Sequence, residues 1–184
     1  MEAYEALLEE IASCKACRLC ETRQNTVPGE GNTATRLMII GEGPGAQEDE
    51  LGRPFVGRAG QLLDKMLDAI EWRREQVYIA NIVKCRPPEN RAPKEDEVQA
   101  CRGFLLRQIA LINPEIILLM GATALNHMMG AQWRITKDRG KWMDLDGRAV
   151  LATFHPAYLL RDPRERPLSF EDLLMIKQRL GKGE

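Results

Sequence analysis

Apolar positions recur along this chain with two different periods, and five stretches follow the helical one. Segment 4–14 carries apolar side chains at helical spacing, and segment 59–70 gathers them on one stripe, as in an amphipathic helix. Segment 94–112 predicts a longer helix, because acidic residues in its first turn complement the helix dipole. Two further helices are expected over 122–129 and 169–180.

Short apolar runs between these helices predict strands. Three strands are expected over 35–41, 76–85 and 115–121, and a hairpin within 141–156 leads into a fourth strand that ends at His155. Because strands alternate with helices, we expect the α/β class. The predicted architecture is a three-layer α/β/α sandwich with a central, mainly four-stranded parallel sheet.

Ligands of such sheets bind beyond the carboxyl ends of the strands, and these ends carry distinctive residues. The first strand runs into Gly41, Gly43 and Gly45, a turn that resembles a phosphate loop. Its third glycine comes one residue too early for a dinucleotide fingerprint, a Walker sequence is absent, and four carboxylates crowd the turn. We therefore expect a neutral ligand held by backbone groups.

Other residues near the strand ends predict a pocket for a flat ring. Asn81 offers a donor and an acceptor side by side, which can match the edge of a nucleobase or an amide. Phe55 can stack on a ring, and His155 can donate to a developing anion. Glu42 and Glu48 are candidates for orienting water or an electrophile. Each residue alone is more often structural, but together they predict a base-sized pocket.

Three of the five cysteines lie close together near the N-terminus, and the chain holds two more further on. Cys14 and Cys17 have the spacing of a ligand pair, and with Cys85 and Cys101 they offer four thiolates to an iron–sulfur cluster or a tetrahedral zinc ion. Cys20 is a fifth cysteine that a four-ligand site does not need, although it can replace one of the other ligands. The alternative is that Cys85 and Cys101 are buried as apolar residues.

Size and charge narrow the classes of protein. The length of 184 residues favours one domain over 1–184, and the net charge of −1 excludes a global field that recruits nucleic acid. Local basic patches lie at 134–142 and 159–166, although such patches are more often solvated faces. No apolar run can span a bilayer, and residues 1–14 lack the pattern of a secretory signal. We expect a cytoplasmic protein.

Three motifs carry a resemblance to a known family. Segments 41–64 (GEGPGAQEDELGRPFVGRAGQLLD), 81–93 (NIVKCRPPENRAP) and 155–163 (HPAYLLRDP) resemble those of the family 4 uracil-DNA glycosylases, the bacterial and archaeal type that carries an iron–sulfur cluster. The resemblance covers nearly the whole chain. It implies a DNA repair enzyme that flips uracil out of DNA, hydrolyses its N-glycosidic bond and leaves an abasic site.

The resemblance also assigns roles to residues. It implies a [4Fe-4S] cluster and leaves Cys20 an ordinary thiol. Uracil would lie against the backbone of the glycine turn, stack on Phe55, and bond to Asn81 and His155. The implied cluster ligands are Cys14, Cys17, Cys85 and Cys101, and the implied uracil-binding residues are Gly41, Glu42, Gly43, Phe55, Asn81 and His155.

The implied partner is uracil-containing DNA, single- or double-stranded. Tyr158, Leu159 and Leu160 are candidates for the wedge that enters the helix where the base has left, and further DNA contacts are expected from Arg86, Asn90, Arg91 and Arg161. A basic insertion that traps uracil DNA covalently in a related branch is absent from 86–97, so turnover is expected. We expect a monomer associated with the nucleoid during repair, and contact with a sliding clamp cannot be read from sequence.

Two rival classes remain open. A non-catalytic iron–sulfur module for nucleic-acid binding or electron transfer would need the cysteines but not the three strand-end side chains together. A nucleotide-binding α/β protein would use the glycine turn for phosphate, which the carboxylates disfavour.

Overall fold

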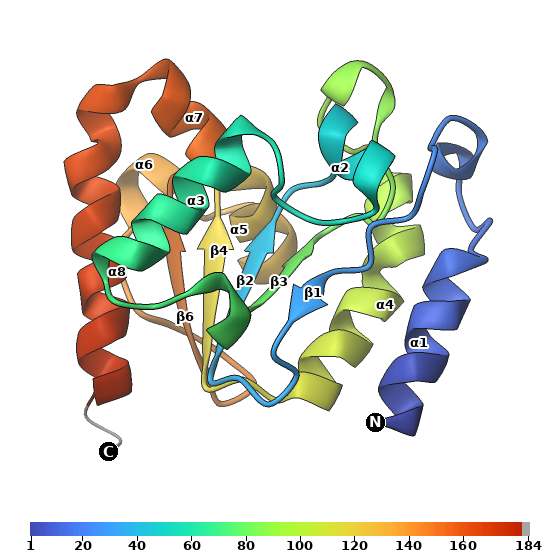
Figure 1. The fold of residues 1–184 in the computed structure, drawn as a ribbon. Helices are drawn as coiled ribbons and strands as arrows, with labels where there is room; N and C mark the ends of the chain where they lie inside the picture. The colour runs from blue at the N-terminus through green and yellow to red at the C-terminus, as the bar shows by residue number, and fades with distance from the viewer. Residues whose placement is uncertain (182–184) are drawn as a thin grey trace.

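Within residues 1–181, the part of the chain that this computed structural model describes, a six-stranded sheet lies between two layers of helices (Figure 1). The three-layer α/β/α architecture predicted from the sequence is therefore confirmed. The single domain expected over 1–184 also includes residues 182–184, which lie outside the described residues.

Four parallel strands form the centre of the sheet, as predicted. The order across the sheet is β1–β3–β2–β4–β6–β5, and the two edge strands pair antiparallel with their neighbours. The parallel strands are β3 (Tyr78–Asn81), β2 (Leu37–Gly41), β4 (Ile116–Met120) and β6 (Arg148–Thr153), and the edge strands are β1 (Glu30–Gly31) and β5 (Met143–Leu145).

All five expected helices are present, together with shorter ones. The expected helices are α1 (Glu2–Ala12), α3 (Arg58–Ala69), α4 (Glu95–Ile112), α5 (Ala122–Met129) and α8 (Arg166–Gly181). The additional ones are α2 (Ala46–Leu51), α6 (Ile135–Asp138) and α7 (Pro156–Arg161), which are too short to show helical periodicity. Across residues 1–181 there is no helix with the length and apolar character needed to cross a membrane.

All four expected strands are shorter in the structure than in the sequence pattern. The strand expected over 76–85 ends at Asn81: the amide of Ile82 makes the last ladder bond, to the carbonyl of Gly41, and the amide of Val83 bonds to the carbonyl of Glu42 outside the alternating pattern. The fourth strand ends at Thr153, since the next residues lead into α7. Apolar pattern alone does not reveal where the chain leaves the sheet.

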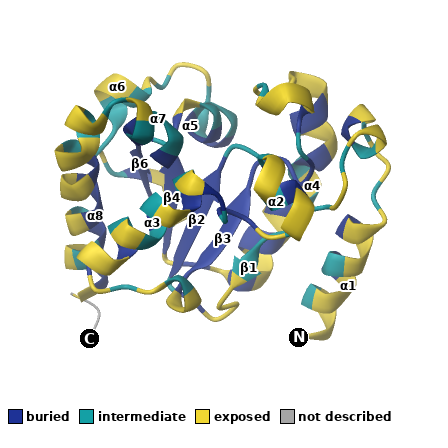
Figure 2. Ribbon diagram, turned by 45° about the horizontal axis from the view of Figure 1, so that its top comes forward, coloured by how far each residue is buried: buried dark blue, intermediate teal, exposed yellow. Residues whose placement is uncertain are grey.

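Alternate residues of β2 face opposite layers, which gives the molecule two cores. Met38 and Ile40 pack with apolar residues of α4 and α5, whereas Leu37 and Ile39 pack with those of α3 and α8. Figure 2 shows the strands buried and the outer sides of the helices exposed. Strands covered on both faces explain why their sequences are continuous apolar runs.

The parallel arrangement gathers polar residues at one edge of the sheet. Pairing of β2 with β3 sets Gly41 opposite Asn81, and pairing of β4 with β6 sets Met120 opposite Thr153. His155 follows two residues after Thr153 and begins α7. The strand ends predicted to form a site therefore lie side by side.

A buried ion pair fastens the end of β6. Asp172 of α8 is 1% exposed and accepts hydrogen bonds from Arg139 at 2.8 and 2.9 Å and from the Thr153 hydroxyl at 2.7 Å. Burial raises the pKa of Asp172, and these donors oppose that shift. The pair therefore ties α8 and the segment after α6 to the strand that leads to His155.

Asp172→Ala is expected to destabilise the fold by about 3–5 kcal/mol, because it leaves the largely buried Arg139 charge without a partner. The measurement is the free energy of unfolding in urea. Lys177→Ala is the control, since Lys177 pairs with Glu71 at the surface and such exposed pairs contribute little to stability. Equal losses in the two variants would contradict the assigned role of Asp172.

Candidate active site and cysteine cavity

Gly41 allows two other residues to approach the end of β2. A Cβ atom at this position would lie 2.5 Å from Cζ of Phe55 and 2.6 Å from Oδ1 of Asn81. Real Cβ atoms do not approach other atoms so closely, so any side chain at Gly41 would push the ring and the amide apart. The glycine is therefore required by contacts and not by its backbone angles.

Asn81 presents a buried acceptor with no partner. Its side chain is 2% exposed, and no group in the described part of the chain donates to Oδ1. An unsatisfied buried acceptor costs about 1–3 kcal/mol, which a bound donor would recover. Oδ1 therefore indicates where a ligand carrying an N–H group would bind.

Phe55 and His155 form the walls of the same site. Their rings are stacked with centroids 5.5 Å apart and planes inclined by 28°. Phe55 is 6% exposed and adopts φ 49°, a left-handed conformation that is uncommon for a residue with a side chain. With Asn81 and Gly41 they are the residues predicted to form a slot for a flat ring, and the structure brings the four together.

The hydrogen bond to His155 fixes its tautomer. The amide of Ala157 donates to Nδ1 at 3.0 Å, so in the neutral ring the proton lies on Nε2. Burial, and then the charge of Arg161, lower the pKa of His155 from 6.5 to about 4. At neutral pH the side chain is thus an uncharged donor through Nε2.

The two candidate carboxylates lie in different surroundings. Glu42 lines a groove together with His155 and accepts a hydrogen bond from the hydroxyl of Thr123. Glu48 lies in α2, beneath the loop, where its Oε2 is buried without a hydrogen-bond partner among residues 1–181 and would be 3.3 Å from a Cβ at Gly57. The structure thus places Glu42, and not Glu48, in the groove that adjoins His155.

The same groove continues along α7, which carries the expected wedge. Tyr158 and Arg161 line the groove, and the Tyr158 ring packs on Phe154 with centroids 5.0 Å apart. Leu160 is half-buried, whereas Leu159 is only 1% exposed. Leu159 faces the core and offers no surface to DNA, so the wedge role expected for it does not fit the structure.

The segment before α4 holds the other expected DNA contacts. Segment 86–93 contains a 3-10 turn at Pro88–Asn90, and Arg86 donates to the side chain of Asn90 at 2.8 Å. Arg91 pairs with Glu97 at 2.8 Å, and Glu97 is fully buried. The charge of Arg91 therefore has a structural partner, whereas Asn90 is exposed and lines the groove.

The sequence reading missed Thr123 and Lys84. Thr123 lies two residues after Gly121, at the end of the third strand, where the strand-end rule gives a usable signal. Lys84 is fully buried and donates to the backbone carbonyl of Asn81 at 2.9 Å and to Gln108 at 2.7 Å. The sequence signal for Lys84 is a lysine within the otherwise mostly apolar run 81–85, which indicates a buried charge with hydrogen-bond partners.

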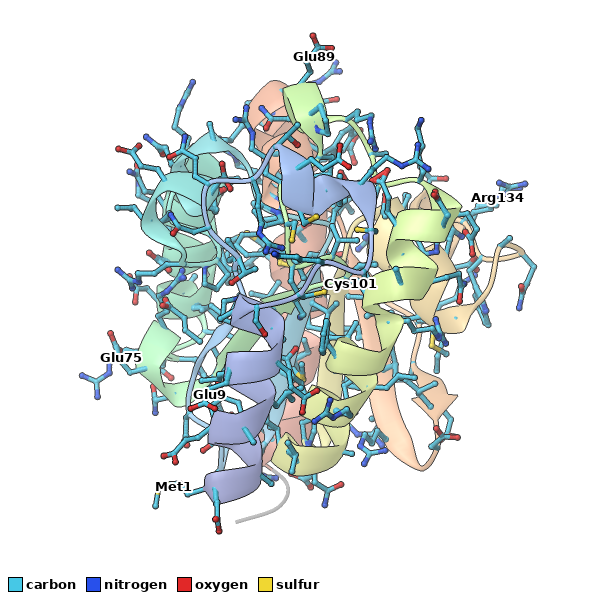
Figure 3. The ribbon with its side chains drawn as sticks, turned by 90° about the vertical axis from the view of Figure 1, so that its right-hand side faces the viewer. Met1, Glu9, Glu75, Glu89, Cys101 and Arg134 are labelled. Atoms are coloured by element: carbon cyan, nitrogen blue, oxygen red, sulfur yellow. The ribbon has the colours of Figure 1, made fainter. Side chains whose placement is uncertain are left out.

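The cysteines gather around one cavity between the N-terminal segment and α4. All five line it, and Figure 3 shows several sulfur atoms near the labelled Cys101. Cys85 and Cys101 are 7% and 9% exposed. Arg23 donates to the sulfur of Cys85 at 3.1 Å, and the amide of Lys84 donates to that of Cys101 at 3.3 Å. Such donors stabilise negative charge on sulfur.

The donor set of the cavity is rich in thiols, which fits the ligand chemistry of an iron–sulfur cluster. Among residues 1–181, no three Cys, His, Asp or Glu side chains are arranged so that they could hold a single metal ion. Four thiolates around zinc must all lie about 2.3 Å from one point, whereas the ligands of a cluster surround a larger body. Burial raises the pKa of Cys101 to about 11, so bound positive charge would be needed to hold its thiolate.

The fold is that of a three-layer α/β protein, and the predicted site lies at the carboxyl ends of its parallel strands, where ligands of such sheets bind. The pattern of the Uracil DNA glycosylase superfamily matches residues 28–177. A type-4 uracil-DNA glycosylase of Thermotoga maritima is 49% identical, over 98% of this chain and 96% of its own length. Those of Pyrobaculum aerophilum and Sulfurisphaera tokodaii are 44% and 43% identical, over 94% and 97% of this chain and 92% and 85% of their own lengths.

This chain belongs to the type-4 uracil-DNA glycosylase family. The resemblance found in the three motifs is thereby confirmed over nearly the whole length of the chain.

An NMR titration of the His155 ring is expected to give a midpoint near pH 4 and not 6.5, with His155→Gln identifying the resonance. Between these values the unfolded chain binds the proton and the folded one does not. Stability contributed by His155 is therefore present at neutral pH and falls as the pH decreases from 6.5 towards 4. A midpoint at 6.5 or above would contradict the buried, uncharged imidazole.

Proposed function

We propose that this chain, acting as one domain over 1–184, hydrolyses the N-glycosidic bond of deoxyuridine in DNA. It releases uracil and leaves an abasic site, the first step of base excision repair. The observation that carries this assignment is the buried, unpartnered Oδ1 of Asn81 beside the stacked rings of Phe55 and His155. Family membership supplies the reaction class.

Asn81 supports selection of uracil over cytosine. Its Oδ1 accepts the N3–H of uracil and its Nδ2 donates to O4, whereas cytosine presents an acceptor and an amino group at these positions. Phe55 stacks on the ring, and the backbone of Gly41, Glu42 and Gly43 lies along its edge. The buried polar groups of such a site are satisfied only by the hydrogen-bonding edge of uracil, so the site discriminates strongly against cytosine.

His155 supports departure of the base. After the nucleotide is extruded, at a cost of a few kcal/mol, the bond between C1′ and N1 breaks and its electron pair stays on uracil. The negative charge spreads to O2 of uracil, where the Nε2–H of His155 donates. This hydrogen bond is stronger in the transition state than in the ground state, so it accelerates the reaction.

A carboxylate supports the attack of water on the sugar. Water adds to C1′ of the cationic sugar and loses a proton. Glu42 suits this role, because it lies in the groove with His155 and the Thr123 hydroxyl holds one of its oxygens. Oε2 of Glu48 is buried beside Gly57, and Glu48 suits the shaping of the glycine turn, because a Cβ atom at Gly45 would lie 3.2 Å from its Oε1.

The surface around the groove supports binding of single- or double-stranded DNA. Tyr158 and Leu160 would fill the gap left by the extruded base. Asn90 and Arg161 are exposed and line the groove, so they would contact the phosphate backbone, and Arg86 and Arg91 are proposed as further contacts. The overall charge of −1 makes such local contacts necessary.

The cysteine cavity supports a [4Fe-4S] cluster held by Cys14, Cys17, Cys85 and Cys101. These four come from the turn after α1, the segment after β3, and α4. A cluster would supply a covalent cross-link among them beside the groove. Cys20 also lines the cavity, and we assign it no ligand role because four thiolates complete the set.

Asn81→Ala and His155→Gln are each expected to slow release of uracil by about 10²–10³-fold, because each removes a group aimed at the leaving base. The assay is alkaline cleavage of uracil-containing oligonucleotides, single- and double-stranded. His127→Gln is the matched control: His127, the other of the two histidines, has its Nδ1 3.6 Å from a carboxylate oxygen of Glu95. Full activity in both site variants would refute the assignment, and tight binding without cleavage by the unaltered protein would support a non-catalytic module.

Cys85→Ser and Cys101→Ser are expected to lose iron and the brown absorption of the purified protein, because serine does not replace a buried thiolate ligand. Iron analysis and visible spectra provide the measurement. Cys20→Ser is the matched control and should keep the full iron content. Loss of iron from Cys20→Ser, with retention in Cys101→Ser, would reverse the ligand assignment.

A further inference from the structure

The ring that lines the slot is carried by a strained backbone. Phe55 has φ 49°, in the left-handed region where a Cβ atom crowds the following carbonyl. Such residues persist only where surrounding groups hold them. The groups that hold Phe55 therefore decide where its ring lies.

Arg74 provides the first of these groups. It lies in the 3-10 turn Arg74–Gln76 between α3 and β3, outside all three motifs, and its side chain is 16% exposed. Its Nη1 donates to the backbone carbonyl of Phe55 at 2.9 Å, and its Nη2 donates to that of Pro54. One guanidinium thus holds two successive carbonyls of the strained turn.

Acidic residues hold the guanidinium in turn. Glu30 of β1 accepts from Nη2 and Nε of Arg74 at 2.8 and 3.0 Å, and Asp64 of α3 accepts from Nη1 at 3.3 Å. Burial alone would raise the pKa of Glu30, but hydrogen bonds from Arg53 and Arg74 outweigh it and lower the pKa. Only the planar fork of arginine offers donors in this arrangement.

Gly60 closes the turn from the other side. A Cβ atom there would lie 1.8 Å from the carbonyl oxygen of Phe55, so the backbone of α3 packs directly against that carbonyl. The Phe55 carbonyl is therefore enclosed between α3 and Arg74, while its ring extends towards Gly41 and His155.

We propose that Arg74 is a positioning residue for base recognition. By holding the carbonyls of Pro54 and Phe55, Arg74 fixes the backbone in the conformation in which the Phe55 ring can stack on uracil. This inference rests on the proposed function. Arg74 touches neither uracil nor DNA in this scheme, and it acts only through Phe55.

A double-mutant cycle tests the inference. The dissociation constant of free uracil is measured by calorimetry for the unaltered protein, Arg74→Gln, Phe55→Ala and the double variant. Phe55→Ala should weaken binding about tenfold or more, the usual contribution of an aromatic ring stacked on a base. Arg74→Gln should weaken it by a similar factor, and the double variant should bind no worse than Phe55→Ala alone, since the two act as one unit.

Arg53→Gln is the matched control. Arg53 also pairs bidentately with Glu30, at 2.8 and 2.9 Å, but it is more than half exposed and donates to neither carbonyl. Its loss should change uracil binding less than about twofold, as for a surface ion pair. If Arg74→Gln does not fold, Arg74→Lys replaces it in the same cycle. Lysine keeps the positive charge but cannot donate to both carbonyls as the planar guanidinium does.

The outcomes separate the two proposals. If Phe55→Ala weakens binding but neither Arg74 variant does, or if their effects simply multiply, Arg74 is not a positioning residue and the uracil pocket stands. If Arg53→Gln weakens uracil binding as much as Arg74→Gln, the ion pair with Glu30 is responsible for the weaker binding, and not the hydrogen bonds from Arg74 to the carbonyls of Pro54 and Phe55. If Phe55→Ala leaves binding unchanged, the proposed pocket itself is wrong.

Discussion

The parallel register between β2 and β3 is the constraint on which the site depends, because it sets Gly41 directly opposite Asn81. Gly41 has no side chain, so the Asn81 amide and the Phe55 ring meet in the space that a Cβ atom would fill. A register shift of one residue would turn Asn81 to the other face of the sheet. Strand pairing, fixed by two apolar cores, thus sets the position of Asn81, the recognition group that we propose.

The base slot and the cysteine cavity share one short segment of chain. Between Asn81 and Cys85, Lys84 donates from its side chain to the Asn81 carbonyl and from its amide to the sulfur of Cys101. Gln108 of α4 accepts from the same ammonium. Lys84 therefore links Asn81 to Cys101 through two hydrogen bonds.

Buried charges lie at the places where the chain must turn sharply beside the site. Glu97 holds Arg91 at the start of α4, Asp172 holds Arg139 near the end of β6, and Glu30 holds Arg74 against the strained turn. Breaking any of these pairs would leave a charge with reduced access to water. The three ion pairs therefore hold the segments that surround the carboxyl ends of the strands.

The sequence by itself determined the α/β class, the central strands, the five longer helices and the family, because apolar periodicity and three local motifs are properties of neighbouring residues. It also singled out Asn81 and His155, whose positions at or just after strand ends follow from the βα pattern, and Phe55, which lies in the loop between α2 and α3. Only the tertiary structure decided that Leu159 is buried, that Glu42 and not Glu48 faces the groove, and that Arg74 holds the Phe55 turn. These facts depend on contacts between segments far apart in the chain, and on helices too short to leave a periodic pattern.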